Sequence, residues 1–159
     1  GDQTYAAPAG GSDPWTYVKL GADFSNSTVT PSNVTGLAFT PGANATYVVE
    51  GFLLMRSAAI TTGVRPGCTW PTGTTDGAAV FSAANSAAAF ANGAEGAGSE
   101  VVANATGIVN TARSVPGWLF ATFITGVAPS GGFQIRLRSE VAASQATLKA
   151  GSWIRYRTI

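Results

Sequence analysis

The chain has no histidine among its 159 residues. Histidine is the commonest general base of enzymes and a frequent metal ligand, so its absence excludes histidine-dependent triads and histidine metal sites. There is one cysteine, Cys68. It cannot form an intrachain disulfide, and alone it excludes thiolate ligation of zinc or iron–sulfur clusters. We therefore expect no metal and no cofactor, and we expect Cys68 to be a small buried hydrophobe.

Charge is also scarce. Charged residues make up 11% of the chain and its net charge is +1, against a usual charged share of about 25%. Nothing in this balance favours binding to nucleic acid or to an anionic membrane, and no run of about 18 apolar residues favours a membrane span. A surface with so little charge is poorly protected against self-association, which predicts an obligate oligomer.

The carboxylates follow no recognisable pattern. Paired carboxylates carry out glycoside hydrolysis, but the acidic residues considered for this role are scattered: Asp13, Asp23, Glu50, Asp76, Glu95, Glu100 and Glu140. We therefore expect no enzymatic activity, and a glycan-degrading depolymerase remains a minor alternative.

The chain length fits one domain. Residues 1–14 are rich in Gly, Pro and Ala without periodicity, which predicts a flexible arm or linker before a single domain over residues 15–159. Most later segments alternate with period two and are rich in β-branched and aromatic residues. Strands are expected at residues 15–20, 27–30, 35–40, 46–58, 77–83, 99–105, 117–127, 132–140, 146–150 and 152–159. About ten strands in one domain predict a β-sandwich or barrel.

Two segments are less regular. Residues 82–98 are rich in alanine and fit a short helix, an extended loop or a small-residue strand. Residues 116–129 are the most apolar stretch, and we expect them to form a buried strand.

Residues 132–140 and 153–158 each alternate apolar side chains with arginines, which predicts strands with one face in the core. Ile154 and Tyr156 are expected to face inward, and the two arginine-bearing strands are expected to be neighbours. Glu50 and Glu140, each in a strand context, are their expected partners. The candidates for ion pairs or contacts between subunits are Glu50, Arg136, Arg138, Glu140, Trp153, Arg155 and Arg157.

Residues 61–77 form the candidate ligand-binding loop, because they are dense in Gly and Pro and too long for a hairpin turn. Arg65, Trp70 and Asp76 could bind a sugar by stacking and hydrogen bonding. The alternative is structural: Trp70 fills the edge of the core and Arg65 pairs with an acidic residue.

Two sequence stretches resemble C-terminal domains of tailed-bacteriophage virion proteins of the tail-fibre or head-decoration type. They are "RPGCTWPTG", residues 65–73, and "KAGSWIRYR", residues 149–157. The resemblance implies an antiparallel jelly-roll-like β-sandwich, forming trimers like the heads of tumour necrosis factor and complement proteins, with an aromatic strand near the threefold axis.

For function, the resemblance implies a virion structural protein made in the host cytoplasm and located on the virion surface. Its expected partners are further copies of itself in a homotrimer, other virion proteins, and a host cell-surface glycan or protein. The first hypothesis is the receptor-binding tip of a tail fibre. The alternative is a capsid decoration, or head-fibre, protein that binds the shell as a trimer.

Overall fold

All regular elements among the described residues are β-strands. The structure is a computed structural model that describes the backbone of residues 14–86, 89–96, 101–102 and 112–159, and the side chains of residues 14–82 and 112–159. Most of the predicted arm, residues 1–13, lies outside the described residues.

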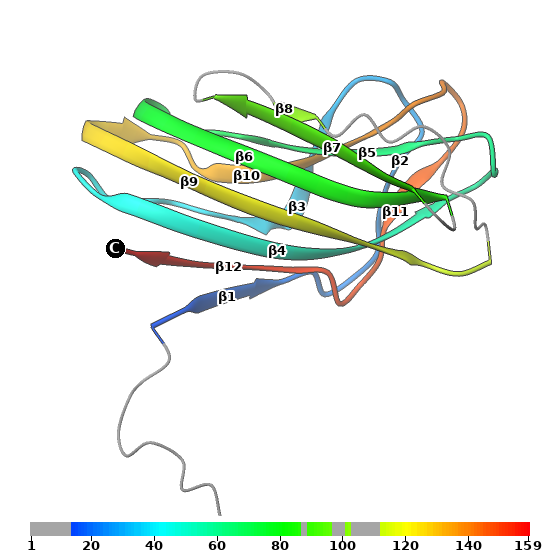
Figure 1. The fold of residues 1–159 in the computed structure, drawn as a ribbon, viewed down its shortest axis with the longest axis horizontal. Helices are drawn as coiled ribbons and strands as arrows, with labels where there is room; N and C mark the ends of the chain where they lie inside the picture. Colours follow the sequence, from blue (N-terminus) through cyan, green and yellow to red (C-terminus); the bar gives the residue numbers. More distant parts are fainter. Residues whose placement is uncertain (1–13, 87–88, 97–100, 103–111) are drawn as a thin grey trace, which may run out of the picture.

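The larger sheet contains eight of the described strands. Six of them follow one another across it, as Figure 1 shows. They are β1 (Thr16–Lys19), β12 (Trp153–Thr158), β4 (Thr46–Ser57), β9 (Val115–Ser130), β6 (Thr72–Ser86) and β7 (Ala89–Gly96). The remaining two extend the far end of β4: β11 (Ala146–Leu148) pairs with β4, and β2 (Phe24–Asn26) pairs with β11.

The smaller sheet has the order β3 (Ser32–Phe39), β10 (Phe133–Ser139), β5 (Val64–Thr69) and β8 (Val101–Val102). From β3 to β6 the chain changes sheet at every step, and it does so again from β9 through β10 to β11. The pairs β1·β12, β3·β10 and β4·β9 are nested in sequence and antiparallel. Nested pairs divided between two sheets form a jelly-roll-like sandwich, which confirms the predicted all-β fold class.

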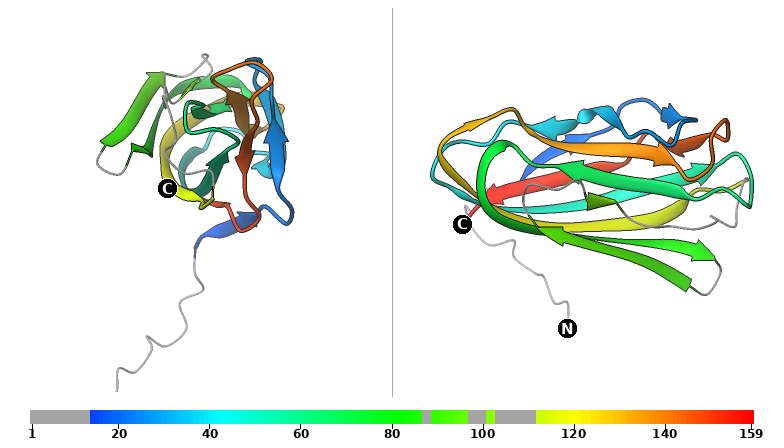
Figure 2. Two further views of the ribbon diagram at one scale, coloured as in Figure 1. Left: turned by 90° about the vertical axis from the view of Figure 1, so that its right-hand side faces the viewer. Right: turned by 90° about the horizontal axis from the view of Figure 1, so that it is seen from above.

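The core lies between the two sheets, which curl around it when seen end-on (Figure 2). Strict alternation in β4 and β10 places one side chain in two inside, as expected for a sheet with one buried face. Two aromatic contacts join the sheets. Phe39 of β3 stacks on Tyr156 of β12 with ring centroids 3.7 Å apart, and Phe123 of β9 stacks with Phe133 of β10 at 5.7 Å.

The C-terminal strand is interior to its sheet, as predicted, because β12 lies between β1 and β4. Ile154 is fully buried and Tyr156 packs against the core. A turn at Gly151, with φ of 94°, separates β11 from β12 while both pair with β4. At this break the Ser152 hydroxyl accepts a hydrogen bond from the Leu54 backbone N–H at 3.0 Å, so the ladder of β4 stays satisfied.

Some strand predictions were wrong. Residues 27–30 were expected to form a strand, but the strand is β2, which ends at Asn26. The buried Asn26 side chain accepts hydrogen bonds from the backbone N–H and the hydroxyl of Thr28, both at 2.8 Å. This local bonding turns the chain away from the sheet.

The expected loop at residues 61–77 instead contains β5 and the start of β6, because Val64, Pro66 and Cys68 bury their side chains. Within residues 82–98 the described segments belong to β6 and β7, so the strand alternative is correct and the helix is wrong. Of residues 99–105, only β8 lies within the described part. The two arginine-bearing strands are not neighbours, because β10 lies in the small sheet and β12 in the large one.

Candidate functional site

The outer face of the large sheet carries large apolar side chains. In β9, Leu119, Ala121 and Phe123 point into the core while Trp118, Phe120 and Ile124 point outward and are 37%, 56% and 40% exposed. The prediction of a buried strand at residues 116–129 is thus correct for one face and wrong for the other. We call the outward-facing set, in which Phe52 and Trp153 are half-buried and the others exposed, the aromatic face; it consists of Tyr17, Phe52, Val80, Trp118, Phe120, Ile124 and Trp153.

Strand register arranges the aromatic face in rows. One row contains Trp153, Phe52 and Trp118 on adjacent strands. Phe52 contacts both indoles, with ring centroids 6.4 Å from Trp153 and 5.9 Å from Trp118. The row beside it crosses the sheet from β1 to β6 and consists of Tyr17, Arg155, Glu50, Phe120 and Val80. An exposed surface with several aromatic side chains around a central ion pair is typical of a protein–protein contact.

An ion pair lies within this face. Arg155 Nε donates to Glu50 Oε2 at 2.8 Å, and Arg155 Nη1 donates to the Tyr17 hydroxyl at 3.1 Å. The hydrogen bonds to Tyr17 and Glu50 raise the pKa of Arg155 above its ordinary value. The Trp15 ring lies 4.5 Å from the Arg155 guanidinium and 4.9 Å from that of Arg157. The arginines of β12 are therefore held against aromatic rings on this surface.

The three candidate ligand-binding residues do not form one site. Arg65 of β5 pairs with Glu140, with Nη2 3.0 Å from Oε1. Trp70 packs edge-on against Phe123 and Phe133, and Asp76 lies exposed on β6 in the other sheet. This arrangement matches the structural alternative for Arg65 and Trp70.

The other candidate residues divide between the sheets. Glu50, Trp153, Arg155 and Arg157 lie on the large sheet as described above. Arg136, Arg138 and Glu140 lie on or beside β10 of the small sheet. Arg136 donates to the Pro31 carbonyl at 2.7 Å, and Arg138 lies opposite Arg65 of β5.

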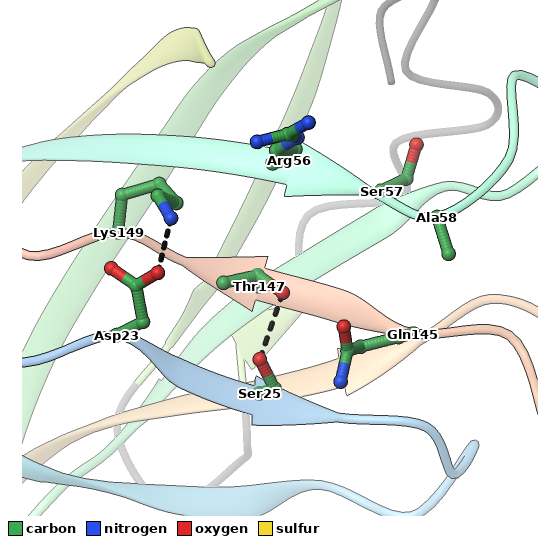
Figure 3. A pocket seen from close by; sticks show the side chains of 8 residues that line it. All are labelled: Asp23, Ser25, Arg56, Ser57, Ala58, Gln145, Thr147 and Lys149. Atoms are coloured by element: carbon green, nitrogen blue, oxygen red, sulfur yellow. Dashed lines mark hydrogen bonds and ion pairs between the residues drawn. The ribbon is translucent and has the colours of Figure 1, made fainter. Parts of the chain in front are cut away.

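A second surface feature is a polar pocket at the end of the large sheet. Its volume is about 340 Å³. Figure 3 shows β4 along one rim, β2 along the other and β11 between them. The lining residues are Asp23, Ser25, Arg56, Ser57, Ala58, Gln145, Thr147 and Lys149.

Hydrogen bonds fix the floor and one side of this pocket. The hydroxyls of Ser25 and Thr147 are hydrogen-bonded at 2.8 Å. Asp23 accepts hydrogen bonds from the Lys149 ammonium and from the Ala150 backbone N–H. The hydrogen bond from Lys149 is the main cause that lowers the pKa of Asp23, and the positive charges of Lys149 and Arg56 also contribute. Asp23 is therefore ionised at neutral pH.

Sequence reasoning missed both features for identifiable reasons. The aromatic face could have been found in β9, where Trp118, Phe120 and Ile124 are apolar at positions that alternate with core residues. The pocket gave no local signal, because Asp23 and Lys149 are 126 positions apart in the sequence. Only the pairing of β2 with β11 brings them together.

Comparisons with known proteins give distant structural likenesses. No protein-family model matches the chain, and no curated protein matches it. The structure of Eiger TNF from S. frugiperda is 9% identical with a TM-score of 0.36, over 92% of this chain and 93% of that one. The structure of infectious bursal disease virus, Gt strain, is 13% identical with a TM-score of 0.23, over 96% of this chain and 42% of that one.

Among the described residues, no helix is long and apolar enough to cross a membrane. Within the same ranges, no group of three or more His, Cys, Asp or Glu side chains could hold a metal ion.

Proposed function

We propose that this protein is a non-enzymatic structural module of a bacteriophage particle, the receptor-binding tip of a tail fibre, and that it works as a homotrimer. It is made in the host cytoplasm and is carried on the virion surface. Its partners are its own copies, neighbouring virion proteins and a glycan or protein of the host surface.

The observation that carries this proposal is the aromatic face. Phe120 and Tyr17 are 56% and 54% exposed in the single chain, and the large indoles of Trp118 and Trp153 lie close to them in the same two rows. Leaving such rings in water is unfavourable by roughly 25 cal/mol for each Å² of apolar surface. Burial against further copies of the chain would remove this cost, and aromatic side chains are the usual anchors of such interfaces.

Two features of the sequence point the same way. A chain with 11% charged residues has little electrostatic protection against association. The stretches that resemble phage virion proteins contribute β5 with the turn after it, and β12, so they belong to the framework of the sandwich. The ion pair of Arg155 and Glu50 would be shielded from water within the assembly and would fix the orientation of neighbouring copies.

Two measurements test the proposal. Light scattering of the purified chain should give three times the mass of one chain, which is 16.1 kDa. Labelled electron microscopy of the intact particle should place the chain at the tip of the tail fibre. A monomer in solution would contradict the assembly, and label on the head would replace the tip assignment by the capsid decoration alternative.

A further inference from the structure

Two charged groups on the outer face of the large sheet have no ionic partner in the described part of the chain. Arg157 of β12 lies against the Trp15 ring, with its guanidinium 4.9 Å from the ring centroid, and its Nε is buried without a hydrogen-bond partner. Asp76 of β6 is exposed, and its Oδ1 accepts a hydrogen bond from the Gly77 backbone N–H at 2.8 Å. Among the described residues, neither group takes part in an ion pair.

Strand order keeps these two charges apart within one chain. β12 and β6 are separated by β4 and β9, as Figure 1 shows. Three strand spacings therefore lie between them, which is about 14 Å at the usual spacing. Outward side chains stand roughly perpendicular to a sheet, so they do not close such a gap. Arg157 and Asp76 can therefore neutralise one another only between two copies of the chain.

Register places both charges at the same end of their strands. Arg157 lies opposite Val48, in a row that continues through Thr122 to Ala78, and Asp76 begins the next row. A ring of copies closes when each copy is related to the next by rotation. Rotation about an axis along the strands would bring the β12 side of one copy against the β6 side of the next, with the two charges at nearly the same height.

An apolar groove lies between the two charges. Its volume is about 290 Å³. The small side chains of the Ala78 row leave this hollow, because the larger Phe120 and Ile124 stand in the rows on either side. The outward side chains that line it are Val48, Ala78, Val80, Phe120 and Thr122, of which only that of Thr122 is polar. The groove can thus receive an apolar side chain of a neighbouring copy, and such contacts exclude water from polar groups around them.

We propose that Arg157 of one copy forms an ion pair with Asp76 of the next at every interface of the oligomer, beside a groove that an apolar side chain of that copy fills. This inference rests on the proposed homotrimer, since it names the contact that orients its copies. A guanidinium can bind a carboxylate at two points, which fixes direction as well as distance. The contact also gives a role to Asp76, which does not share a ligand site with Arg65 and Trp70.

The test is a charge-reversal cycle in the full chain, with the dissociation constant measured by light scattering over a dilution series. Arg157→Asp and Asp76→Arg should each raise the dissociation constant at least about tenfold, because each places two like charges against one another. The double variant restores opposite charges at every interface. Its dissociation constant should therefore return to within about threefold of that of the unaltered chain.

Lys19→Asp is the matched control, because it reverses a positive charge on the same face, in the row of Trp153. Combined with Asp76→Arg, it should leave the dissociation constant at least as high as Asp76→Arg alone does. Circular dichroism should show all variants to be folded. Thermal unfolding of the monomer should be little changed by Asp76→Arg, because Asp76 is exposed in the single chain and its carboxylate forms no ion pair there.

A double variant that associates no more tightly than the single variants would overturn the inference, and so would equal rescue by Lys19→Asp. Single variants that assemble as tightly as the unaltered chain would also overturn it, while leaving the homotrimer in place. An unaltered chain that is a monomer would overturn the proposed assembly and this inference with it. Failure of the ion pair is therefore distinguishable from failure of the proposed function.

Discussion

The solvent faces of the two sheets differ in how their side chains are used. On the small sheet, long polar side chains bind to the protein itself: Arg65 pairs with Glu140, Arg136 donates to the Pro31 carbonyl and Gln134 donates to the Val34 carbonyl at 3.0 Å. On the large sheet, Phe120 and its neighbours leave broad apolar surfaces exposed. These long side chains of the small sheet are therefore satisfied within the chain, whereas the large sheet exposes apolar rings that the proposed oligomer would cover.

This contrast separates the stabilisation of the fold from its assembly. Both sheets contribute equally regular alternation to the shared core, as β4 and β10 show. The two sheets differ on their outward faces. On the aromatic face, burial within one chain does not explain why the side chains are apolar. Changes on the small-sheet face should alter folding stability, and changes on the aromatic face should alter association.

The largest effect is expected from removing the chain after Gly151. This truncation deletes β12 from between β1 and β4 and removes Tyr156 from its stack on Phe39. The large sheet then loses both its continuity and one contact with the small sheet, so we expect no cooperative unfolding transition by circular dichroism. Deleting Ile159 alone, which is 71% exposed, is the control and should leave a folded oligomer.

The next largest effect is expected from Phe120→Asp on the aromatic face. A charge at this position would have to be desolvated in the interface, so the dissociation constant should rise by about a hundredfold or more. Folding stability should change by less than about 0.5 kcal/mol, because Phe120 is exposed in the single chain. Light scattering over a dilution series measures the first quantity, and thermal unfolding of the monomer measures the second.

Val141→Asp is the matched control for that experiment. Val141 is 44% exposed and follows β10, away from the aromatic face. It should not change the mass of the oligomer. If Phe120→Asp also remained a full oligomer, the aromatic face would not be the interface.

The sequence was sufficient to predict the fold class, because period-two alternation is clear in the long strands β4, β9 and β10 and indicates sheets with one buried face. The strand prediction failed at residues 27–30, where the Asn26 side chain accepts a backbone hydrogen bond in place of a neighbouring strand. The prediction also failed at residues 61–77, where Gly and Pro favoured a loop but the chain forms strands. Gly67 and Pro66 in β5 lie opposite Arg136 and Leu137 of β10, and this tertiary pairing outweighs their low strand propensity.

The site was less predictable than the fold. One of the two alternatives paired Arg65 with a carboxylate, which is correct. Glu140 was a candidate for an ion pair, but it is 75 positions from Arg65 and the sequence did not match the two residues. The pocket depends on three strands that meet only through register. Alternation predicts which way a side chain points, but it does not predict which strand lies beside it.

A smaller and opposite pair of effects is expected from two matched substitutions, Glu140→Gln and Glu50→Gln. Glu140 binds Arg65 and also accepts from the Gly63 N–H at 2.8 Å, so its loss should destabilise folding by about 1–2 kcal/mol. The thermal midpoint should fall by roughly 2–8 °C with no change in oligomer mass. Glu50→Gln removes the partner of Arg155 within the aromatic face, so it should raise the dissociation constant about tenfold. If the two substitutions had the same effect on both measurements, the contrast between the sheets would be refuted.

The smallest effect concerns Asp23 at the polar end of the large sheet. Its pKa in the folded chain lies below the ordinary value of 3.8, chiefly because Lys149 donates a hydrogen bond to it. A carboxylate with a lowered folded pKa stabilises the fold above its unfolded pKa, and this contribution is lost as the pH falls through the folded value. The thermal midpoint of the unaltered chain should therefore exceed that of Asp23→Asn at neutral pH, and the two should converge once the pH falls below the pKa of Asp23 in the folded chain. Asp76→Asn removes the same charge from an exposed position on β6, so it separates a general charge effect from the Lys149 contact. A difference that persisted unchanged in acid would mean that Asp23 stabilises the turn before β12 without its charge.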